Sequence, residues 1–258
     1  MGANPVRGLK NGPAMAYNTG EYGARGLRAE RKGIMSINIA IDGPVGAGKS
    51  SIADQVAGRL GILHLDTGAM YRALALYALR SGVELTDEAA VSACCAQADI
   101  AVGYADGRQR TLLSGEDVSD LIRTGKVSAA ASVVSKWPAV RERMVALQQE
   151  LARKGNMLID GRDIGTVVLA DSPCKIYLTA SAEERARRRY LQNLEKGDNT
   201  PFEDVLAALN ARDAQDMGRA VSPLRQAEDA VLVDSTDMTR EEVVDAIVRI
   251  VEGIYGKQ

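Results

Sequence analysis

The sequence GPVGAGKS (Gly43–Ser50) follows the apolar run Ile37–Ile41 and precedes helical sequence from Ser51 to Leu60. It matches the pattern G-x-x-x-x-G-K-[ST] at every fixed position, in the strand, turn and helix context that this pattern requires. Glycines are needed because a Cβ would block positive φ, or the close approach of backbone N–H groups to a phosphate chain. The expected phosphate-binding residues are Gly43, Pro44, Val45, Gly46, Ala47, Gly48, Lys49, Ser50 and Ser51.

Two side chains of this phosphate-binding loop carry the expected chemistry. Lys49 would reach the terminal phosphates and act in catalysis, and the Ser50 hydroxyl would bind Mg²⁺. The alternative is a glycine turn between a strand and a helix that ends in Lys-Ser by chance. The context around the loop favours the functional interpretation.

Composition limits the classes of protein that this chain can belong to. Its 258 residues fit one large domain or two small ones, and a net charge of −2 provides no global field for nucleic acid or an anionic membrane. The apolar runs are shorter than a membrane helix needs.

Cys94, Cys95 and Cys174 form neither a disulfide framework nor a metal-ligand spacing, so we expect structural cysteines and a cytoplasmic protein. We interpret His64, the only histidine, as a packed strand residue.

The first 34 residues differ from the rest of the chain. They contain scattered glycines and basic residues without apolar periodicity, and they lack the apolar centre of a secretory signal. We expect residues 1–34 to be a disordered extension, and the functional start to be Met35, with a targeting or nucleic-acid-binding arm as the alternative.

From Ile37 onward, short apolar runs alternate with helical sequence, which predicts a doubly wound α/β fold with a parallel sheet covered on both faces. The five predicted strands are Ile37–Asp42, Ile62–Asp66, Met157–Asp160, Lys175–Thr179 and Ala230–Asp234. A hairpin is expected at residues 100–114, inserted between the second and third strands of the core. Capping boxes are expected at Ser181, Thr200 and Thr239.

Polar clusters follow two of the predicted strands. Asp66 and Arg72 come after the second strand, and Asp160, Arg162 and Asp163 come with the third. Ligands of open α/β sheets bind at the carboxyl ends of the strands, so both clusters would share a rim with the phosphate-binding loop. Helix caps with solvated charges are the alternative for either cluster alone.

Two groups of arginines lie further along the chain. Arg185, Arg187, Arg188 and Arg189 exceed what Glu183 and Glu184 can pair at i, i+4, and the surplus would suit a lid closing over polyphosphate, with Arg188 in catalysis. In the second group the spacing is i, i+4 and i+7, which predicts one helical face. Its members are Arg212, Asp216 and Arg219. A salt-bridged exposed face would give the same patterns.

With these clusters assembled, the sequence resembles the bacterial cytidylate kinases, a family of nucleoside monophosphate kinases, over Ile37 to Tyr255. The motifs that carry the resemblance are IDGPVGAGKSS (Ile41–Ser51), LDTGAMYR (Leu65–Arg72), GEDVSDLIRT (Gly115–Thr124), DGRDIGTVV (Asp160–Val168), RD (Arg212–Asp213) and RAVSPL (Arg219–Leu224). The glycine loop occurs in many nucleotide-binding proteins, whereas LDTGAMYR and DGRDIGTVV at these spacings are specific to this family. Thr67 stands where serine is common.

The resemblance implies one P-loop kinase domain over residues 35–258. Its core would comprise residues 37–66, 156–180 and 220–256, with a monophosphate-binding region at about 67–155 and a short lid at about 183–200. It also implies ATP and Mg²⁺ as cofactors, CMP and dCMP as substrates, and a monomer without nucleic-acid or membrane partners. Lys49, Arg162 and Arg188 would act in catalysis. The implied substrate-binding residues are Thr67, Arg72, Ser132, Arg141, Arg162, Asp163, Arg212, Asp216 and Arg219.

Three other functions remain open on the sequence alone. A different small-molecule P-loop kinase, acting on another nucleotide or on shikimate, would share the loop. A regulatory GTPase would need a guanine-recognising N-K-x-D element, and no such string occurs in the chain. A nucleic-acid-binding protein conflicts with the near-neutral charge and with the single Trp and single Phe.

Overall fold

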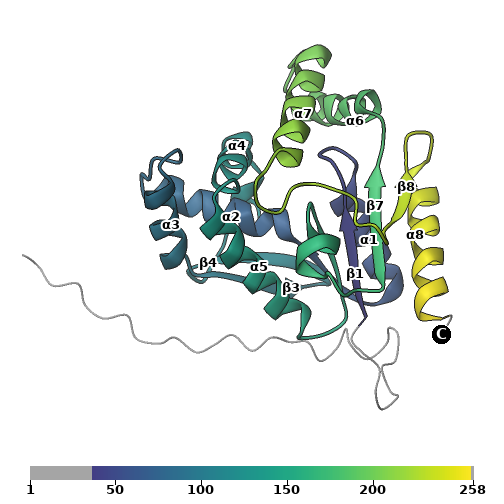
Figure 1. Cartoon of the computed structure of the whole chain (residues 1–258). Helices are drawn as coiled ribbons and strands as arrows, with labels where there is room; N and C mark the ends of the chain where they lie inside the picture. Colours follow the sequence, from purple (N-terminus) through teal and green to yellow (C-terminus); the bar gives the residue numbers. More distant parts are fainter. Residues whose placement is uncertain (1–36, 257–258) are drawn as a thin grey trace, which may run out of the picture.

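The computed structural model describes residues 37–256 (Figure 1). The expected disordered extension at residues 1–34 and the expected start at Met35 lie outside the described residues. Among residues 37–256, no helix is long and apolar enough to cross a bilayer. The three cysteines are buried and free, which agrees with the expected structural role.

The predicted five-stranded parallel sheet is confirmed, with each strand end within one residue of its predicted position. Its strands pair in the order β2-β6-β1-β7-β8, all parallel. They are β1 (Asn38–Asp42), β2 (Leu63–Asp66), β6 (Met157–Gly161), β7 (Cys174–Thr179) and β8 (Val231–Asp234). The central strand β1 is buried on both faces, which explains why Ile39–Ile41 are all apolar instead of alternating with polar residues.

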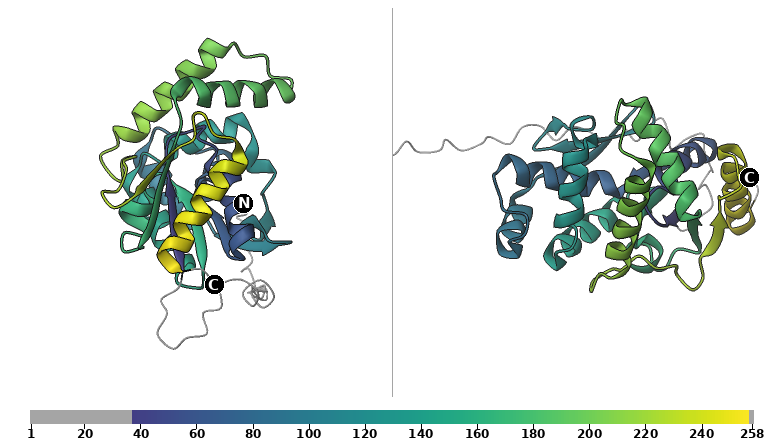
Figure 2. Two further views of the ribbon diagram at one scale, coloured as in Figure 1. Left: turned by 90° about the vertical axis from the view of Figure 1, so that its right-hand side faces the viewer. Right: turned by 90° about the horizontal axis from the view of Figure 1, so that it is seen from above.

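Helices cover both faces of the sheet, and side chains of β1 alternate between two cores. Ile39 and Ile41 pack with α1 (Lys49–Leu60) and α8 (Arg240–Tyr255), whereas Ala40 packs on the other face. The helices on that other face are α2 (Thr67–Arg80), α3 (Glu88–Gln97), α4 (Gly125–Val134) and α5 (Pro138–Ala152). In Figure 1 and the right view of Figure 2, α2 to α4 extend beyond the β2 edge and α8 lies at the opposite end.

Helices α6 (Ala182–Glu195) and α7 (Phe202–Met217) pack on each other through a small apolar cluster of their own. They project above the carboxyl ends of the strands in both upright views (Figures 1 and 2). Thr239 with Glu242 forms the predicted capping box of α8. Ser181 caps α6 by accepting from the Glu184 N–H, but the full box expected there is wrong, because the Glu184 carboxylate accepts from Arg187 and Arg188 instead. The predicted cap at Thr200 is wrong, because this hydroxyl donates to Asp198 and α7 begins only after Pro201.

The predicted inserted hairpin is confirmed as β3 (Ile100–Ala105) and β4 (Arg108–Leu113), joined by a two-residue turn. A third strand, β5 (Glu116–Asp117), was not predicted because two residues give no periodicity. The hairpin reaches the free edge of β2, where the Tyr104 hydroxyl donates to the His64 carbonyl at 3.1 Å. Gln109 accepts from the backbone N–H of Asp66 at 2.7 Å. Side chains of the insert therefore form hydrogen bonds with backbone groups of the edge strand β2.

Candidate active site

The phosphate-binding loop runs from the end of β1 into α1, as predicted. Gly43 has φ +152° and lies so close to β7 that an added Cβ would stand 1.9 Å from the Leu178 carbonyl oxygen. No other residue fits there without moving backbone. Gly48 precedes α1 with φ +84° and offers no side chain to cap it. The backbone N–H groups of the first turn of α1 therefore remain available to an anion.

Lys49 lies across this loop and is buried. Its Nζ donates to the carbonyl oxygens of Gly43 and Pro44, each at 2.7 Å. Burial, followed by the nearby charge of Arg162, lowers the pKa of Lys49 to about 7, against the opposing effect of three aspartates. One of these three is Asp216 on α7, so the charge of a residue on α7 acts on the lysine of the loop.

Ser50 faces a carboxylate at the end of β6. Its Oγ donates to Oδ2 of Asp160 at 3.0 Å. A hydroxyl and a carboxylate side by side next to a phosphate-binding loop are the hard oxygen donors that Mg²⁺ prefers. Sequence reasoning placed Asp160 on the rim but missed this contact; its place at the end of an apolar strand was the available signal.

Asp216 is the centre of an arginine cluster. This fully buried carboxylate accepts from Arg162 Nε at 2.9 Å, Arg212 Nε at 3.1 Å and Arg219 at 2.5 Å. Burial opposes its ionisation, but the three arginines outweigh burial and hold the pKa of Asp216 below its ordinary value. The prediction of one helical face fails for Arg219, because α7 ends at Met217 and Arg219 reaches back from the following turn.

A second buried ion pair joins α5 to the turn after β6. Arg141 donates to Asp163 Oδ2 at 2.6 Å, and its guanidinium lies 5.6 Å from the centroid of the Tyr71 ring. Nearby, Ser132 on α4 accepts a hydrogen bond from the Gln215 amide at 2.8 Å. Removing one partner of such a buried ion pair is costly, so Arg141 anchors α5 to the turn after β6, while the bond between Ser132 and Gln215 joins α4 to α7.

The start of α2 contributes a further pair of an arginine and a carboxylate. Arg72 donates to Asp66 Oδ2 at 2.7 Å, and Asp66 also caps the helix by accepting from the Ala69 N–H. The Thr67 hydroxyl donates to the Asp160 carbonyl at 2.8 Å. The end of β6 is thereby tied both to the phosphate-binding loop, through Ser50, and to α2.

The assembled site carries a surplus of positive charge. Five arginines face three carboxylates, and the Nε donors of three of these arginines are buried without a hydrogen-bond partner in the described part of the chain. The arginines are Arg72, Arg141, Arg162, Arg212 and Arg219. Guanidinium groups bind phosphate oxygens in pairs and keep their charge when buried, so the cluster suits a phosphate ester.

The predicted lid arginines are more fully paired than the sequence indicated. Arg188 donates to Glu184 at 2.8 Å and to the Ser235 carbonyl at 2.6 Å. Arg187 also pairs with Glu184 rather than with Glu183. Among residues 37–256, no hydrogen bond joins Arg188 to the arginine cluster around Asp216.

Two supporting contacts escaped sequence reasoning. Arg185 and Asp213 form a buried ion pair that holds Val45 of the phosphate-binding loop. Arg185 donates to the Val45 carbonyl, and Asp213 accepts from the Val45 N–H.

Asp42 accepts from the N–H groups of Ile164 and Gly165 at 2.8 and 2.7 Å. Burial raises the pKa of Asp42 to about 7. Its place at the end of β1, directly before the loop, was the one available signal.

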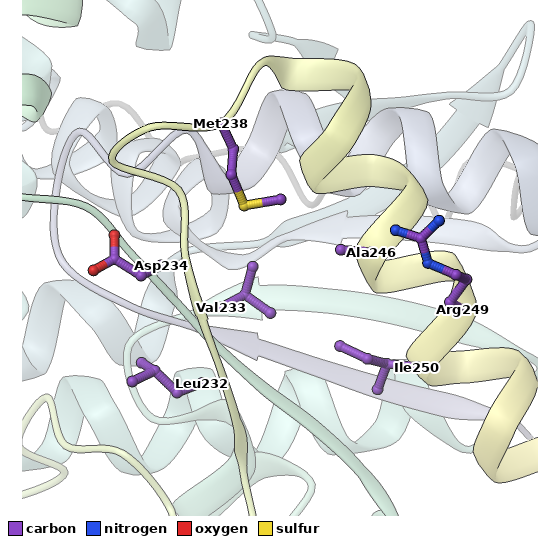
Figure 3. A pocket seen from close by; sticks show the side chains of 7 residues that line it. All are labelled: Leu232, Val233, Asp234, Met238, Ala246, Arg249 and Ile250. Carbon is purple, nitrogen blue, oxygen red and sulfur yellow. The ribbon is translucent and has the colours of Figure 1, made fainter.

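A separate hollow of about 480 Å³ lies between β8 and α8 (Figure 3). Its lining is mostly apolar, with Val233 and Ile250 facing each other across it and Asp234 and Arg249 as its charged members. It contains no residue of the phosphate-binding loop or of the arginine cluster. Its composition does not suit a phosphorylated ligand.

A family profile described as cytidylate kinase matches residues 39–253. The chain belongs to the cytidylate kinase family. A cytidylate kinase from Caldicellulosiruptor saccharolyticus is 46% identical over 222 residues, covering 86% of this chain and 98% of that protein. A cytidylate kinase from Pseudomonas aeruginosa is 49% identical over 213 residues, covering 82% and 93%.

Solved structures resemble the chain less closely. A shikimate kinase from Acinetobacter baumannii covers 86% of this chain and 94% of its own, with 18% identity and a TM-score of 0.40. That similarity is too low to bear on the choice of substrate. Membership of the cytidylate kinase family rests on the sequence comparisons, and the P-loop α/β fold rests on the sheet and loop described above.

Proposed function

We propose that this chain transfers the γ-phosphoryl group of MgATP to CMP or dCMP, giving CDP or dCDP and ADP, as a monomeric cytoplasmic enzyme of pyrimidine nucleotide metabolism. The observation that carries the proposal is the cluster of arginines around Asp216, electrostatically linked to Lys49 in the phosphate-binding loop. A loop and a cluster that can each bind an anion suit the transfer of a phosphoryl group from one phosphate to another. The relatives named cytidylate kinase supply the identity of the acceptor.

The donor nucleotide would occupy the loop from Gly43 to Ser51. Backbone N–H groups at the start of α1 and the ammonium of Lys49 would bind its phosphates. Ser50, with Asp160 beside it, would hold Mg²⁺. The described residues contain no cluster of three metal-ligating side chains, and Mg²⁺ carried by a nucleotide needs only one or two carboxylate or hydroxyl ligands. Bound Mg²⁺ would supply charge neutralisation and orient the phosphates.

The acceptor would occupy the arginine cluster, in the region of residues 67–155 together with α7. Arg72, Arg162 and Arg219 would hold the CMP phosphate, with Thr67 at its edge, and Arg212 and Asp216 on α7 would contact the nucleotide from the other side. This phosphate needs no general base, because its second pKa near 6 leaves it mostly a dianion at pH 7. Catalysis would consist of alignment and charge stabilisation by Lys49 and Arg162.

Recognition of cytosine would rest on Ser132, Arg141 and Asp163. Because the Ser132 oxygen already accepts from Gln215, its hydroxyl proton is left to donate. Cytosine offers acceptors at N3 and O2, whereas uracil carries a hydrogen on N3 that would face this donor. Each buried polar group left unpaired by the wrong base costs about 1–3 kcal/mol, which gives a ten- to hundredfold preference.

The lid at residues 183–200 remains part of this proposal. For Arg188 to reach the phosphates, α6 would have to move and Arg188 would have to leave the Ser235 carbonyl. Closure would exclude water and suppress ATP hydrolysis. An Arg188→Ala variant should therefore transfer more slowly and release more inorganic phosphate than the wild type; wild-type values of both would remove Arg188 from the mechanism.

A steady-state panel of acceptors tests the proposed function. With MgATP, we expect the highest kcat/KM for CMP and dCMP, and values lower by about tenfold or more for UMP, because of the unpaired groups described above. AMP and shikimate should be poorer still. If UMP, AMP or shikimate proved the best acceptor, the chain would be a P-loop kinase of another specificity.

A further inference from the structure

His64 on β2 is a buried group that the proposed transfer does not use. Its Nδ1 lies 2.5 Å from Oδ1 of Asp54, and its Nε2 lies 2.8 Å from Oδ1 of Asp160. Both ring nitrogens therefore lie within hydrogen-bond distance of a carboxylate oxygen, so the ring is held between two aspartates.

The three residues come from three different elements. His64 lies on β2, Asp160 on β6, and Asp54 on α1, one turn after Ser50. Ser50 and Asp54, at i and i+4, face the same side of α1. His64 therefore ties the first turns of the helix that follows the phosphate-binding loop to the strand that carries Asp160.

The two oxygens of Asp160 have separate partners. His64 occupies Oδ1, and the Ser50 hydroxyl occupies Oδ2. With Oδ1 held, the carboxylate cannot rotate without breaking a charge-assisted hydrogen bond, so Oδ2 stays directed at Ser50. Without His64, Asp160 would keep its burial but lose this constraint on its Oδ1.

We propose that His64 is a positioning residue that fixes the Asp160 carboxylate beside Ser50, and thereby strengthens the binding of MgATP over that of ATP alone. This inference rests on the proposed function, because it assumes that the metal-bound nucleotide sits at Ser50. His64 itself contacts neither nucleotide. Residues that orient the ligands of a metal change its affinity typically by 10- to 100-fold when they are removed.

Calorimetric titration with ATP, in excess Mg²⁺ and in EDTA, tests the inference through binding rather than turnover. In His64→Leu, we expect the gain in ATP affinity from Mg²⁺ to fall roughly tenfold, by analogy with other groups that orient metal ligands. The affinity for ATP in EDTA and the affinity for CMP should match the wild type. A purely structural role of His64 would lower the melting temperature or change all three affinities together.

Asp54→Asn is the matched control. Asp54 is exposed, and its replacement leaves the bond between His64 and Asp160 in place, so the Mg²⁺-dependent gain should remain at the wild-type value. If His64→Leu does not fold, His64→Asn, whose shorter amide cannot span both carboxylates, should show the same tenfold reduction.

Two outcomes would overturn the inference: a wild-type Mg²⁺-dependent gain in the folded His64 variants, or an equal loss of affinity in Mg²⁺ and in EDTA. Either could occur while the wild-type protein phosphorylates CMP, which leaves the proposed function intact. Failure of the wild type to phosphorylate CMP would instead remove the proposed function itself.

Discussion

Lys49→Ala should lower kcat for CMP phosphorylation by about 10³-fold, the upper end of what one lost charge-stabilising donor costs. Lys49 is the ammonium group held directly within the phosphate-binding loop, bound to the carbonyls of Gly43 and Pro44. Alanine would leave the transferring phosphoryl group without that cation. Steady-state kinetics at saturating MgATP and CMP measure the loss, and thermal unfolding shows whether the variant is folded.

Lys175→Ala is the control for Lys49→Ala. Lys175 is equally buried, but its ammonium bonds to the Ala170 carbonyl and to Asp229, outside the loop. Its removal should lower the melting temperature while kcat stays within a few-fold of the wild type. Comparable losses of kcat in the two variants would mean that Lys49 serves only the stability of the protein.

The second large effect is expected for Arg162→Ala, which should reduce kcat/KM for CMP by about 10²- to 10³-fold. Arg162 bonds to Asp216 through Nε and to the Gly161 carbonyl through NH1. Its NH2 group makes no hydrogen bond within residues 37–256, so it is available to a phosphate. The charge of Arg162 also acts on Lys49, so we expect Arg162 to lie close to both proposed phosphates.

Binding measurements separate this role from a general effect of charge. Arg162→Ala should weaken CMP binding and slow transfer, while MgATP affinity changes little. Arg143→Ala provides the control, since Arg143 also bonds to backbone carbonyls, at Ala96 and Ala98, but lies outside the cluster. A folded Arg162→Ala enzyme with wild-type kcat/KM would exclude Arg162 from the acceptor site.

Most of the fold could be predicted from the sequence because its signals are local. The five core strands are short apolar runs between recognisable turns, and Thr239 with Glu242 is a capping box within four residues. The predictions failed where another interaction replaced the one that the local pattern indicated. Thr200 bonds to Asp198 instead of capping α7, and Arg219 reaches Asp216 from beyond the end of the helix.

The candidate site was predictable as a set of residues but not as a network. Strand ends, together with family motifs, pointed to the residues of the arginine cluster. Their mutual contacts join distant parts of the chain, as in the bond between Ser132 and Gln215, which depends on tertiary packing. His64 was predicted to be a packed strand residue; it is buried, and its two aspartate partners lie 10 and 96 residues away.

In the proposed mechanism, the loop and the arginine cluster together form one transfer site for CMP. The most direct measurement follows the label from [γ-³²P]ATP in a mixture of equal concentrations of CMP and UMP. We expect the label mainly in CDP, little label in inorganic phosphate, and no transfer without Mg²⁺. Label found mainly in UDP, or in inorganic phosphate whether or not CMP is present, would contradict it.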